Sequence, residues 1–330
     1  MKRPNALKII FSLAGLAVLY FLFQKMGAGN VADRIYQMGW PLVLVLFFPI
    51  IVQHILFVYG WRLAIPGRSA SFWSLFQVHL LGEAFNYIIP SGQMGGEPMK
   101  AFSLRRDIGG IPALGSVIAA KTVKTIAMVL FILAGILLSV DLDPLSPEFK
   151  KTTLASVLLF LSLCVLFLLL QHRGLFGPLA RFLEKRSFPV PAGFRNKIAQ
   201  WDVLDADLKE FYTGRKQKFL FSLFLFTAGW AVGFLEVSLF LHLLGVPSSL
   251  STALAIEAFS LMINTALFFV PGGLGTQEGG KVLIFQLLSL DPVTGLTLGL
   301  ARRMREMTWV AFGLAVFVYW PLHMKVASNK

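Results

Sequence analysis

Long runs of apolar residues, separated by short polar stretches, make up most of the chain. Each run approaches the roughly 20 apolar residues that an α-helix needs to cross the hydrocarbon core of a bilayer. We therefore expect an all-α, polytopic membrane helical bundle with roughly six to nine crossings or partial crossings. The runs are Ile9–Phe23, Pro41–Trp61, Leu114–Val140, Thr153–Gln171, Phe219–Leu244, Ala253–Val270 and Val293–Leu322.

The composition supports a membrane location and excludes a soluble protein. Hydrophobic residues make up 56% of the chain and charged residues 14%, against about 25% charged residues in average soluble domains. Thirty Lys and Arg against 17 Asp and Glu give a net charge of +13. We attribute this excess to cytoplasmic loops and anionic lipid surfaces, and expect no nucleic acid partner.

Nothing in the sequence indicates a metal or a cofactor. The one cysteine, Cys164, lies in an apolar run, so an intrachain disulfide or a cysteine-based metal cage is excluded. His54 and His242 stand outside any metal-binding spacing and are interpreted as packed histidines. Neither a Walker loop nor a GxSxG elbow is present.

The distribution of basic residues predicts which loops face the cytoplasm. Lys2, Arg3 and Lys8 precede the first run, and the stretch 172–218 holds ten Lys and Arg against five acids. By the positive-inside rule both lie inside, in a bacterial-type cytoplasmic (inner) membrane with both termini in the cytoplasm. Residues 194–211 of this connector predict an amphipathic strut on the membrane surface or against the bundle. Its apolar face consists of Ile198, Trp201, Leu204, Leu208 and Phe211.

A Gly- and Pro-rich break interrupts the polypeptide after the apolar arm Phe72–Ile89. The break, Pro90–Pro98, leads into the basic residues Lys100, Arg105 and Arg106. One crossing here would move the ten-cation connector outside, so an even number of crossings is required. Two short arms that enter and leave from the cytoplasmic face, a re-entrant pair, meet this requirement. Such backbone is tolerated at membrane depth where protein buries it or where it lines a wet cavity.

The same pattern occurs a second time at a constant offset of 181 residues. Pro90, Gly92, Glu97 and Lys100 match Pro271, Gly273, Glu278 and Lys281, and Lys121 and Lys124 match Arg302 and Arg305. Counting crossings from an inside N-terminus inverts the second unit relative to the first. Inverted repeats with broken helices are typical of transporters, whose binding site lies near the midplane where the repeats meet. The alternative is an old duplication retained for packing alone.

These repeats divide a single transmembrane domain, 1–330, into four parts. They are a first span and linker (1–40), a first repeat with an extra span (41–171), the cytoplasmic connector (172–218) and a second repeat (219–330).

Charged residues inside the apolar stretches are the candidate site. A charge at that depth costs at least about 2.5 kcal/mol, so it usually faces a cavity or a partner, although long stems can also snorkel to an interface. Acids after the breaks either join a charge network or complement the dipole of a helix start. The predicted substrate-binding and gating residues are Glu97, Lys100, Lys121, Lys124, Glu278, Lys281, Arg302 and Arg305. The predicted cavity-lining residues are Glu83, Asn86, Pro90, Gly92, Asn264, Pro271 and Gly273. Further polar residues in apolar arms are Gln53, Glu236 and Glu257.

Over nearly its whole length the chain resembles the transmembrane region of the lysylphosphatidylglycerol synthase family. The residues that carry the resemblance are Pro90–Glu97 and Pro271–Glu278, with Glu83 and Asn86 upstream and Arg302, Arg303 and Arg305 downstream. Stand-alone members are flippase-like or hopanoid-associated membrane proteins. The resemblance implies a polytopic helical protein that handles or translocates anionic or isoprenoid lipids. Bifunctional relatives append a soluble aminoacyl-transferase domain, and because this chain ends at Lys330 we do not expect it to aminoacylate lipids.

Three functional hypotheses remain open from the sequence. The first is a flippase-like translocator in which Lys121, Lys124, Arg302 and Arg305 bind a phosphate-bearing head group while Glu97 and Glu278 gate access. The second is an intramembrane enzyme with Glu97 or Glu278 as general base, and the third is a non-catalytic membrane subunit acting on lipid-linked substrates. We expect a transporter rather than an enzyme, with membrane lipids as partners; a protein partner or a homo-oligomer is left open.

Overall fold

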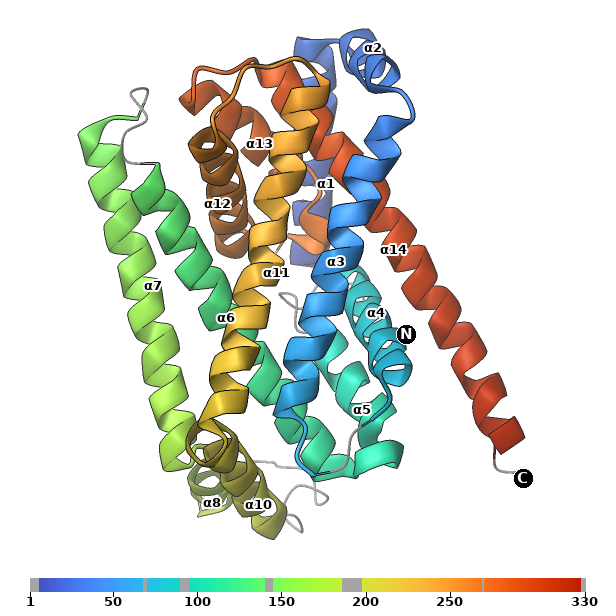
Figure 1. Cartoon of the computed structure of the whole chain (residues 1–330), viewed down its shortest axis with the longest axis vertical. Helices are drawn as coiled ribbons and strands as arrows, with labels where there is room; N and C mark the ends of the chain where they lie inside the picture. Colours follow the sequence, from blue (N-terminus) through green and yellow to red (C-terminus); the bar gives the residue numbers. More distant parts are fainter. Residues whose placement is uncertain are drawn as a thin grey trace.

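The chain is helical throughout the part that the structure describes. The computed structural model describes residues 6–67, 70–89, 95–139, 145–185, 198–268 and 270–327, and within these ranges it contains thirteen α-helices and no strand (Figure 1). The predicted all-α fold is confirmed. The long helices are α1 (Ala6–Met26), α3 (Pro41–Ala64), α6 (Gly110–Leu138), α7 (Pro147–Arg173), α11 (Lys216–Leu243) and α14 (Pro292–Ala327). The shorter elements are α2 (Ala28–Met38), α4 (Phe72–Ile88), α5 (Gly96–Ile108), α8 (Phe176–Lys185), α10 (Ile198–Lys209), the π-helical turn η1 (Glu210–Gly214), α12 (Leu250–Ala266), the 3-10 turn η2 (Pro271–Gly273) and α13 (Thr276–Leu287).

Local signals explain where several helices start. The hydroxyl groups of Ser71, Ser146 and Ser249 accept hydrogen bonds from backbone N–H groups three residues later, at 3.1, 3.2 and 3.1 Å, and so cap α4, α7 and α12. Helix α6 starts at Gly110, earlier than the predicted Leu114, because Gly109 turns the chain with a φ of 95° directly before it. The apolar run alone does not reveal this start, since the first turn of α6 is only weakly hydrophobic.

Four of the described helices are long and apolar enough to cross a membrane: α3, α6, α7 and α11. Helix α7 has large apolar side chains on its outer face, and Leu159 is 64% exposed and Leu163 53% exposed. Contiguous apolar surface of this extent is not stable against water, so it indicates contact with lipid tails. Helix α14 is longer still, at 36 residues, but has several charged residues near its centre.

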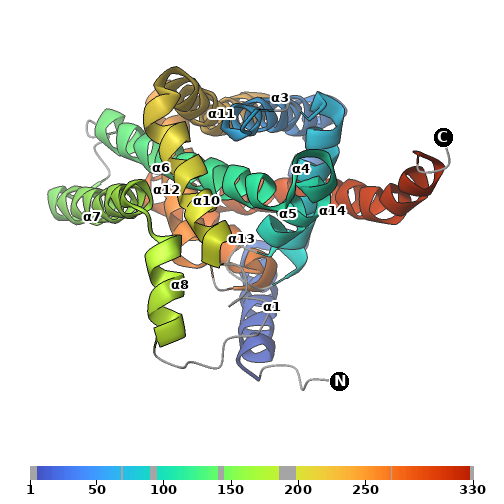
Figure 2. The same cartoon turned by 90° about the horizontal axis from the view of Figure 1, so that it is seen from below.

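Two short helix pairs lie at opposite ends of the bundle (Figure 1). Helices α4 and α5 pack together near the end that also holds α8 and α10, whereas α12 and α13 pack together near the other end. Helices α3 and α11 lie side by side and run in opposite directions between the two ends (Figures 1 and 2). Placement at opposite ends is what two inverted repeats require, although inversion and re-entry remain predictions.

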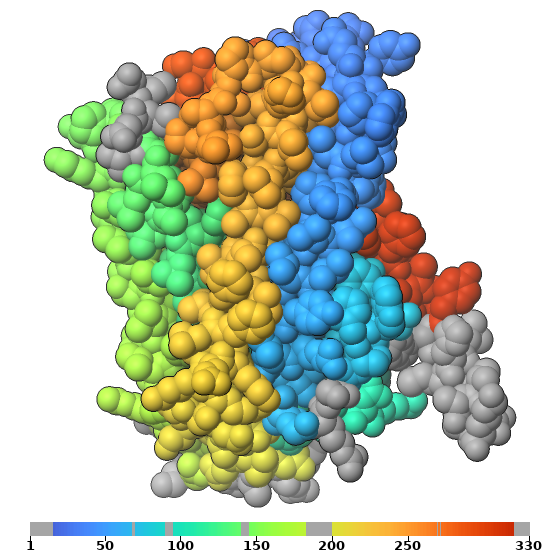
Figure 3. All heavy atoms as spheres, in the orientation of Figure 1, coloured from blue at the N-terminus to red at the C-terminus, as the bar shows by residue number. Residues whose placement is uncertain are grey.

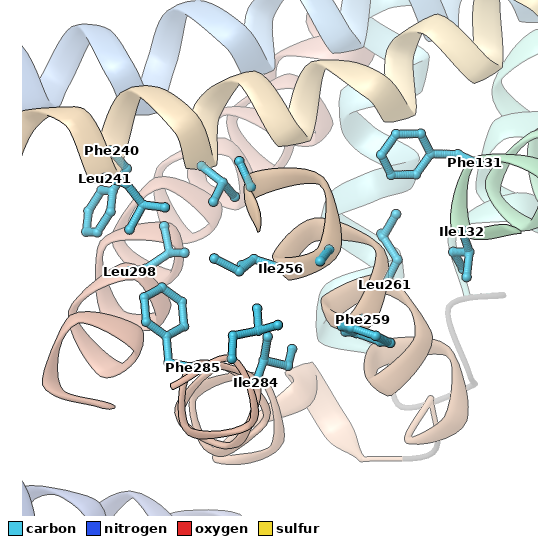
Figure 4. Packing of buried hydrophobic residues seen from close by; sticks show 14 of the residues in the cluster. Phe131, Ile132, Phe240, Leu241, Ile256, Phe259, Leu261, Ile284, Phe285 and Leu298 are labelled. Atoms are coloured by element: carbon cyan, nitrogen blue, oxygen red, sulfur yellow. The ribbon is translucent and has the colours of Figure 1, made fainter. Parts of the chain in front are cut away.

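The apolar core has two main parts. One surrounds α12, where Ile256 faces Phe285 of α13 and Leu298 of α14 (Figure 4), and where the ring of Phe259 lies 5.8 Å from that of Phe149 in α7. The other joins α3, α4, α6 and α10 with the start of α11. In the space-filling view α3 and α11 form a continuous ridge over this face of the molecule (Figure 3). The cores therefore hold each short helix pair against the long helices.

The connector packs against the bundle as well as lying at its end. Leu204 and Leu208 of α10 and Phe211 of η1 are buried beside α6. The Asp205 carboxylate accepts hydrogen bonds from the backbone N–H groups of 175–177 at 2.7–3.1 Å, which ties the start of α8 to α10. Of the predicted apolar face, Trp201 is half-buried, and the side chain of Ile198 lies outside the described part.

Glycine allows helix α4 to approach its neighbours closely. A Cβ on Gly96 of α5 would lie 1.8 Å from the carbonyl oxygen of Gly82 in α4. On another side of α4, a Cβ on Gly313 of α14 would lie 2.4 Å from the carbonyl oxygen of Leu80. Small residues that let backbones approach are characteristic of helix packing in membranes. Helix α4 is thereby held between α5 and α14.

We expect Gly96→Ala to lower the free energy of unfolding by about 1–3 kcal/mol, because the added methyl group forces α4 and α5 apart. Thermal unfolding of the purified protein in detergent measures this. Gly110→Ala is the matched control, because a Cβ there meets no atom within 4 Å. Equal stability of the two variants would contradict the close crossing.

Candidate functional site

A cavity of about 300 Å³ lies between the two helix pairs. Residues of α3, α4 and α6 line it together with residues of α11, α12, α13 and α14. Turn η2, which joins α12 to α13, also contacts α4 of the first pair. Of the residues predicted from the sequence, the cavity brings together Glu83, Asn86, Lys124, Asn264, Gly273, Lys281, Arg302 and Arg305.

In the first half, Glu83 of α4 is the centre of a buried ion network. Its carboxylate lies 3.0 Å from Nζ of Lys100 and 3.4 Å from Nζ of Lys124. Glu97 of α5 lies 3.5 Å from Lys100 and 3.4 Å from Lys121. The predicted residues Glu97, Lys100 and Lys121 therefore line a second, smaller cavity of about 30 Å³ beside the larger one, and Lys124 lines both.

Aromatic rings hold Lys124 in place. Its ammonium group lies 4.2 Å from the centroid of the Phe57 ring and 5.5 Å from that of Trp230. The indole N–H of Trp230 donates to the carbonyl oxygen of Lys124 at 3.1 Å. A cation over aromatic faces is stabilised without a carboxylate, so Lys124 is less dependent on Glu83 than Lys100 is.

In the second half, two arginines of α14 share the carboxylate of Glu236 in α11. Arg302 lies 3.3 Å from Glu236 and 2.8 Å from Glu257 of α12, and Arg305 lies 2.5 Å from Glu236. All four side chains are buried. The predicted cations at Arg302 and Arg305 are therefore already paired, and any anion must compete with these carboxylates.

Arg303 joins the two halves of the molecule. Its guanidinium lies 2.7 Å from Glu278 and donates to the carbonyl oxygens of Gly272 and Gly273 in η2. It also donates to the hydroxyl of Tyr87 on α4. Glu278 accepts a hydrogen bond from the backbone N–H of Gly275 at 3.0 Å, is fully buried, and does not line the cavity. The sequence offered two interpretations of Glu278, a helix start and a charge network, and the side chain has both contacts: it caps the start of α13 and pairs with Arg303.

Lys281 differs from its counterpart Lys100. It is 2% exposed and lines the larger cavity. Among the described residues, no carboxylate lies within 4 Å of it. Two differences account for this: the position 181 residues after Glu83 is Asn264, and Glu278 is bound to Arg303 instead. An ammonium group buried without a counter-ion is expensive, so this lysine is the clearest anion-binding group in the cavity.

Three of the predicted residues lie wholly or partly outside the part of the chain that the structure describes, and three residues that line the cavities were not predicted. Pro90 and Gly92 lie outside the described residues, as does the side chain of Pro271. Tyr87 and Glu306 line the larger cavity and His79 lines the smaller one, although no pattern in the sequence singled out these three residues. Asn86 accepts a hydrogen bond from the backbone N–H of Gly96 at 2.8 Å, and so also holds the start of α5. Within the described ranges, no cluster of His, Cys, Asp and Glu is suited to a metal ion.

Comparison with known proteins identifies the family of this chain. The family model described as the lysylphosphatidylglycerol synthase transmembrane region matches residues 5–315. The chain belongs to this family. The predicted resemblance is confirmed, and with it a lipid-related role in a membrane.

One curated protein matches the chain over nearly its whole length. It is a UPF0104 membrane protein of Methanothermobacter thermautotrophicus, 23% identical, and the alignment covers 97% of this chain and 96% of the relative. No solved structure matches the chain.

We expect Glu236→Gln to destabilise the protein by about 3 kcal/mol, because it leaves two buried arginines without their shared carboxylate. Chemical unfolding in detergent measures the loss. Glu210→Gln is the control, since this carboxylate is 61% exposed in its 3.3 Å pair with Arg215, and exposed pairs contribute at most about 1 kcal/mol. A Glu236→Gln protein as stable as this control would show that the arginines have another partner.

Proposed function

We propose that the protein is a flippase-like lipid translocator that moves an anionic phospholipid or an isoprenoid-linked lipid across the cytoplasmic membrane. The observation that carries the proposal is the buried Lys281, which lines a polar cavity between two helix pairs and has no carboxylate within 4 Å among the described residues. A phosphate group supplies a negative charge to pair with the ammonium group of this lysine. The family's lipid-related membrane role agrees with such a substrate.

The proposed phosphate site centres on Lys281 and Lys124 instead of on all four cations that the sequence predicts. Lys281 and Lys124 line the cavity from opposite halves, and each has a weaker carboxylate interaction than the arginines have. Arg302 and Arg305 take part by exchanging Glu236 and Glu257 for the phosphate. Such exchange releases carboxylates as the lipid binds, and this gives a way to gate the cavity.

The cavity suits the head group alone, and the acyl or prenyl tail remains among the lipids that surround the bundle. A volume of about 300 Å³ is at the lower end of the range for small-molecule sites. Rocking of one helix pair against the other exposes the head group to each side in turn. The contact of Arg303 with Tyr87 and η2 lies where the two pairs meet, so it has to change during such a movement.

The proposed orientation places the α4–α5 end in the cytoplasm. That end has many basic residues on the elements that reach it, as the positive-inside rule requires. They are Arg62, Arg105, Arg106, Arg173, Arg181, Lys209, Arg215, Lys216 and Lys218. In this orientation α4 and α5 form a re-entrant pair from the inside, and α12 and α13 form one from the outside.

We expect Lys281→Gln to slow the translocation of a fluorescent phosphatidylglycerol in proteoliposomes about tenfold or more, because a charge-assisted hydrogen bond to phosphate is lost. Glu97→Gln, Glu278→Gln and the Arg302→Gln/Arg305→Gln double variant should also be impaired. Lys218→Gln, an exposed lysine at the start of α11, is the matched control. Wild-type rates in all the site variants would refute the translocator, and a covalently altered lipid product would indicate an enzyme.

Single cysteines test the orientation. In a Cys164→Ala background, Thr213→Cys in η1 should react only with a reagent that reaches the cytoplasm, since both the charge rule and the proposed topology place it inside. Ser248→Cys, in the exposed loop before α12, should react from outside the cell. Labelling of both positions from the same side would rule out the inverted arrangement.

A further inference from the structure

Two buried histidines form a direct hydrogen bond beside the ion network. Nδ1 of His54 on α3 lies 3.0 Å from Nε2 of His79 on α4. The rings are 8% and 3% exposed. A neutral imidazole has one protonated and one bare nitrogen, so one histidine of the pair donates and the other accepts.

The histidine pair connects the two cavities. His54 lines the cavity of about 300 Å³, and His79 lines the cavity of about 30 Å³. The smaller cavity has room for an ordered water and extends to Trp61, near the end of α3. Trp309 and Phe57 cover the pair from the sides, with ring centroids 4.9 Å from His54 and 6.3 Å from His79. The pair is therefore a polar connection within an aromatic wall.

The outer nitrogens of the pair have different surroundings. Nδ1 of His79 lies 3.8 Å from the Glu83 carboxylate, an ion-pair distance that is longer than a hydrogen bond. Nε2 of His54 is buried and has no hydrogen-bond partner among the described residues. With the His79 proton on Nδ1 towards Glu83, Nε2 of His79 accepts from Nδ1–H of His54. This leaves Nε2 of His54 with an open lone pair.

Lys124 links the charge on this pair to the contents of the larger cavity. Glu83, Lys100, Lys124 and Arg305 are the charged groups that act on His54, from α4, α5, α6 and α14. Glu97 and Lys121 line the smaller cavity beside His79, and Glu236, Glu306 and Lys281 line the larger one. Lys124 lines both cavities and binds Glu83 at 3.4 Å. A phosphate bound by Lys124 and Lys281 draws Lys124 away from Glu83. The released carboxylate then turns to His79 and favours a proton on the pair.

We propose that His54, His79 and Glu83 form a proton-binding relay, and that each phosphate-bearing lipid that enters the larger cavity takes up about one proton with it. The proton bonds to the open lone pair on Nε2 of His54, whose Nδ1–H continues to donate to Nε2 of His79. The Glu83 carboxylate, released by Lys124, balances the added charge through Nδ1–H of His79. The proton compensates the charge of the phosphate, which lowers the cost of carrying that charge through the bilayer. This inference rests on the proposed function.

Calorimetric titration tests the relay without requiring translocation. Short-chain phosphatidylglycerol is added to the purified full-length protein near neutral pH, in buffers with different ionisation enthalpies, and the number of protons taken up is read from the difference in heat. A phosphodiester does not titrate near neutrality, so protons that are taken up bind to the protein. We expect about one proton per bound lipid for the wild type.

Two variants locate the proton. His79→Gln and His54→Asn each place a non-titrating amide at the contact atom, so both should bind the lipid with no proton uptake. His242→Asn, at the exposed end of α11, is the control and should keep the wild-type proton number. Having two variants on different helices keeps the test valid if one fails to fold.

The outcomes separate the relay from the translocator. Lipid binding by the wild type without proton uptake overturns the relay and leaves the translocator standing, as does uptake that persists in both histidine variants. Failure of the wild type to bind or translocate the lipid overturns both.

Discussion

The need to pair buried charges governs the centre of this molecule. Six cations from α5, α6 and α14 lie within 4 Å of a carboxylate: Lys100, Lys121, Lys124, Arg302, Arg303 and Arg305. Removing one partner from such a network leaves an uncompensated charge in a low-dielectric interior, which is strongly destabilising. The helices that supply partners are therefore fixed relative to one another.

The two halves of the molecule pair their buried charges differently. In the first half, Glu83 neutralises two lysines and stands beside a histidine. In the second half, the position 181 residues after Glu83 is Asn264, and among the described residues no carboxylate lies within 4 Å of Lys281. The first half therefore has a carboxylate where the second half has an amide, and the second half has a buried lysine outside the ion pairs. A cavity between two identical halves would lack this polarity.

The halves pack together extensively, α3 against α11 and α4 against α14, and specific polar contacts join them as well. Arg303 binds the broken turn η2 of one pair and the Tyr87 hydroxyl of the other. Glycine crossings fix α4 between α5 and α14, so a movement of α14 is transmitted to the helix that holds both Glu83 and His79. Packing and electrostatics therefore act on the same elements, and the proposed coupling between the cavity and the histidine pair depends on this.

The sequence by itself determined the helical fold, the approximate spans and most of the charged residues that lie buried among the helices, and it predicts a repeat. Hydrophobic runs and a constant offset are local properties, and a charge in an apolar run such as Arg302 is conspicuous wherever it occurs. Tertiary structure decided the pairing. Glu236 and Glu257 reach Arg302 from other helices. Glu278 binds Arg303 rather than Arg302. The hydrogen bond of His79 is to His54, which lies on another helix. Which partner a buried charge finds depends on helix rotation and crossing, and these follow from close packing over the whole bundle rather than from spacing along the chain.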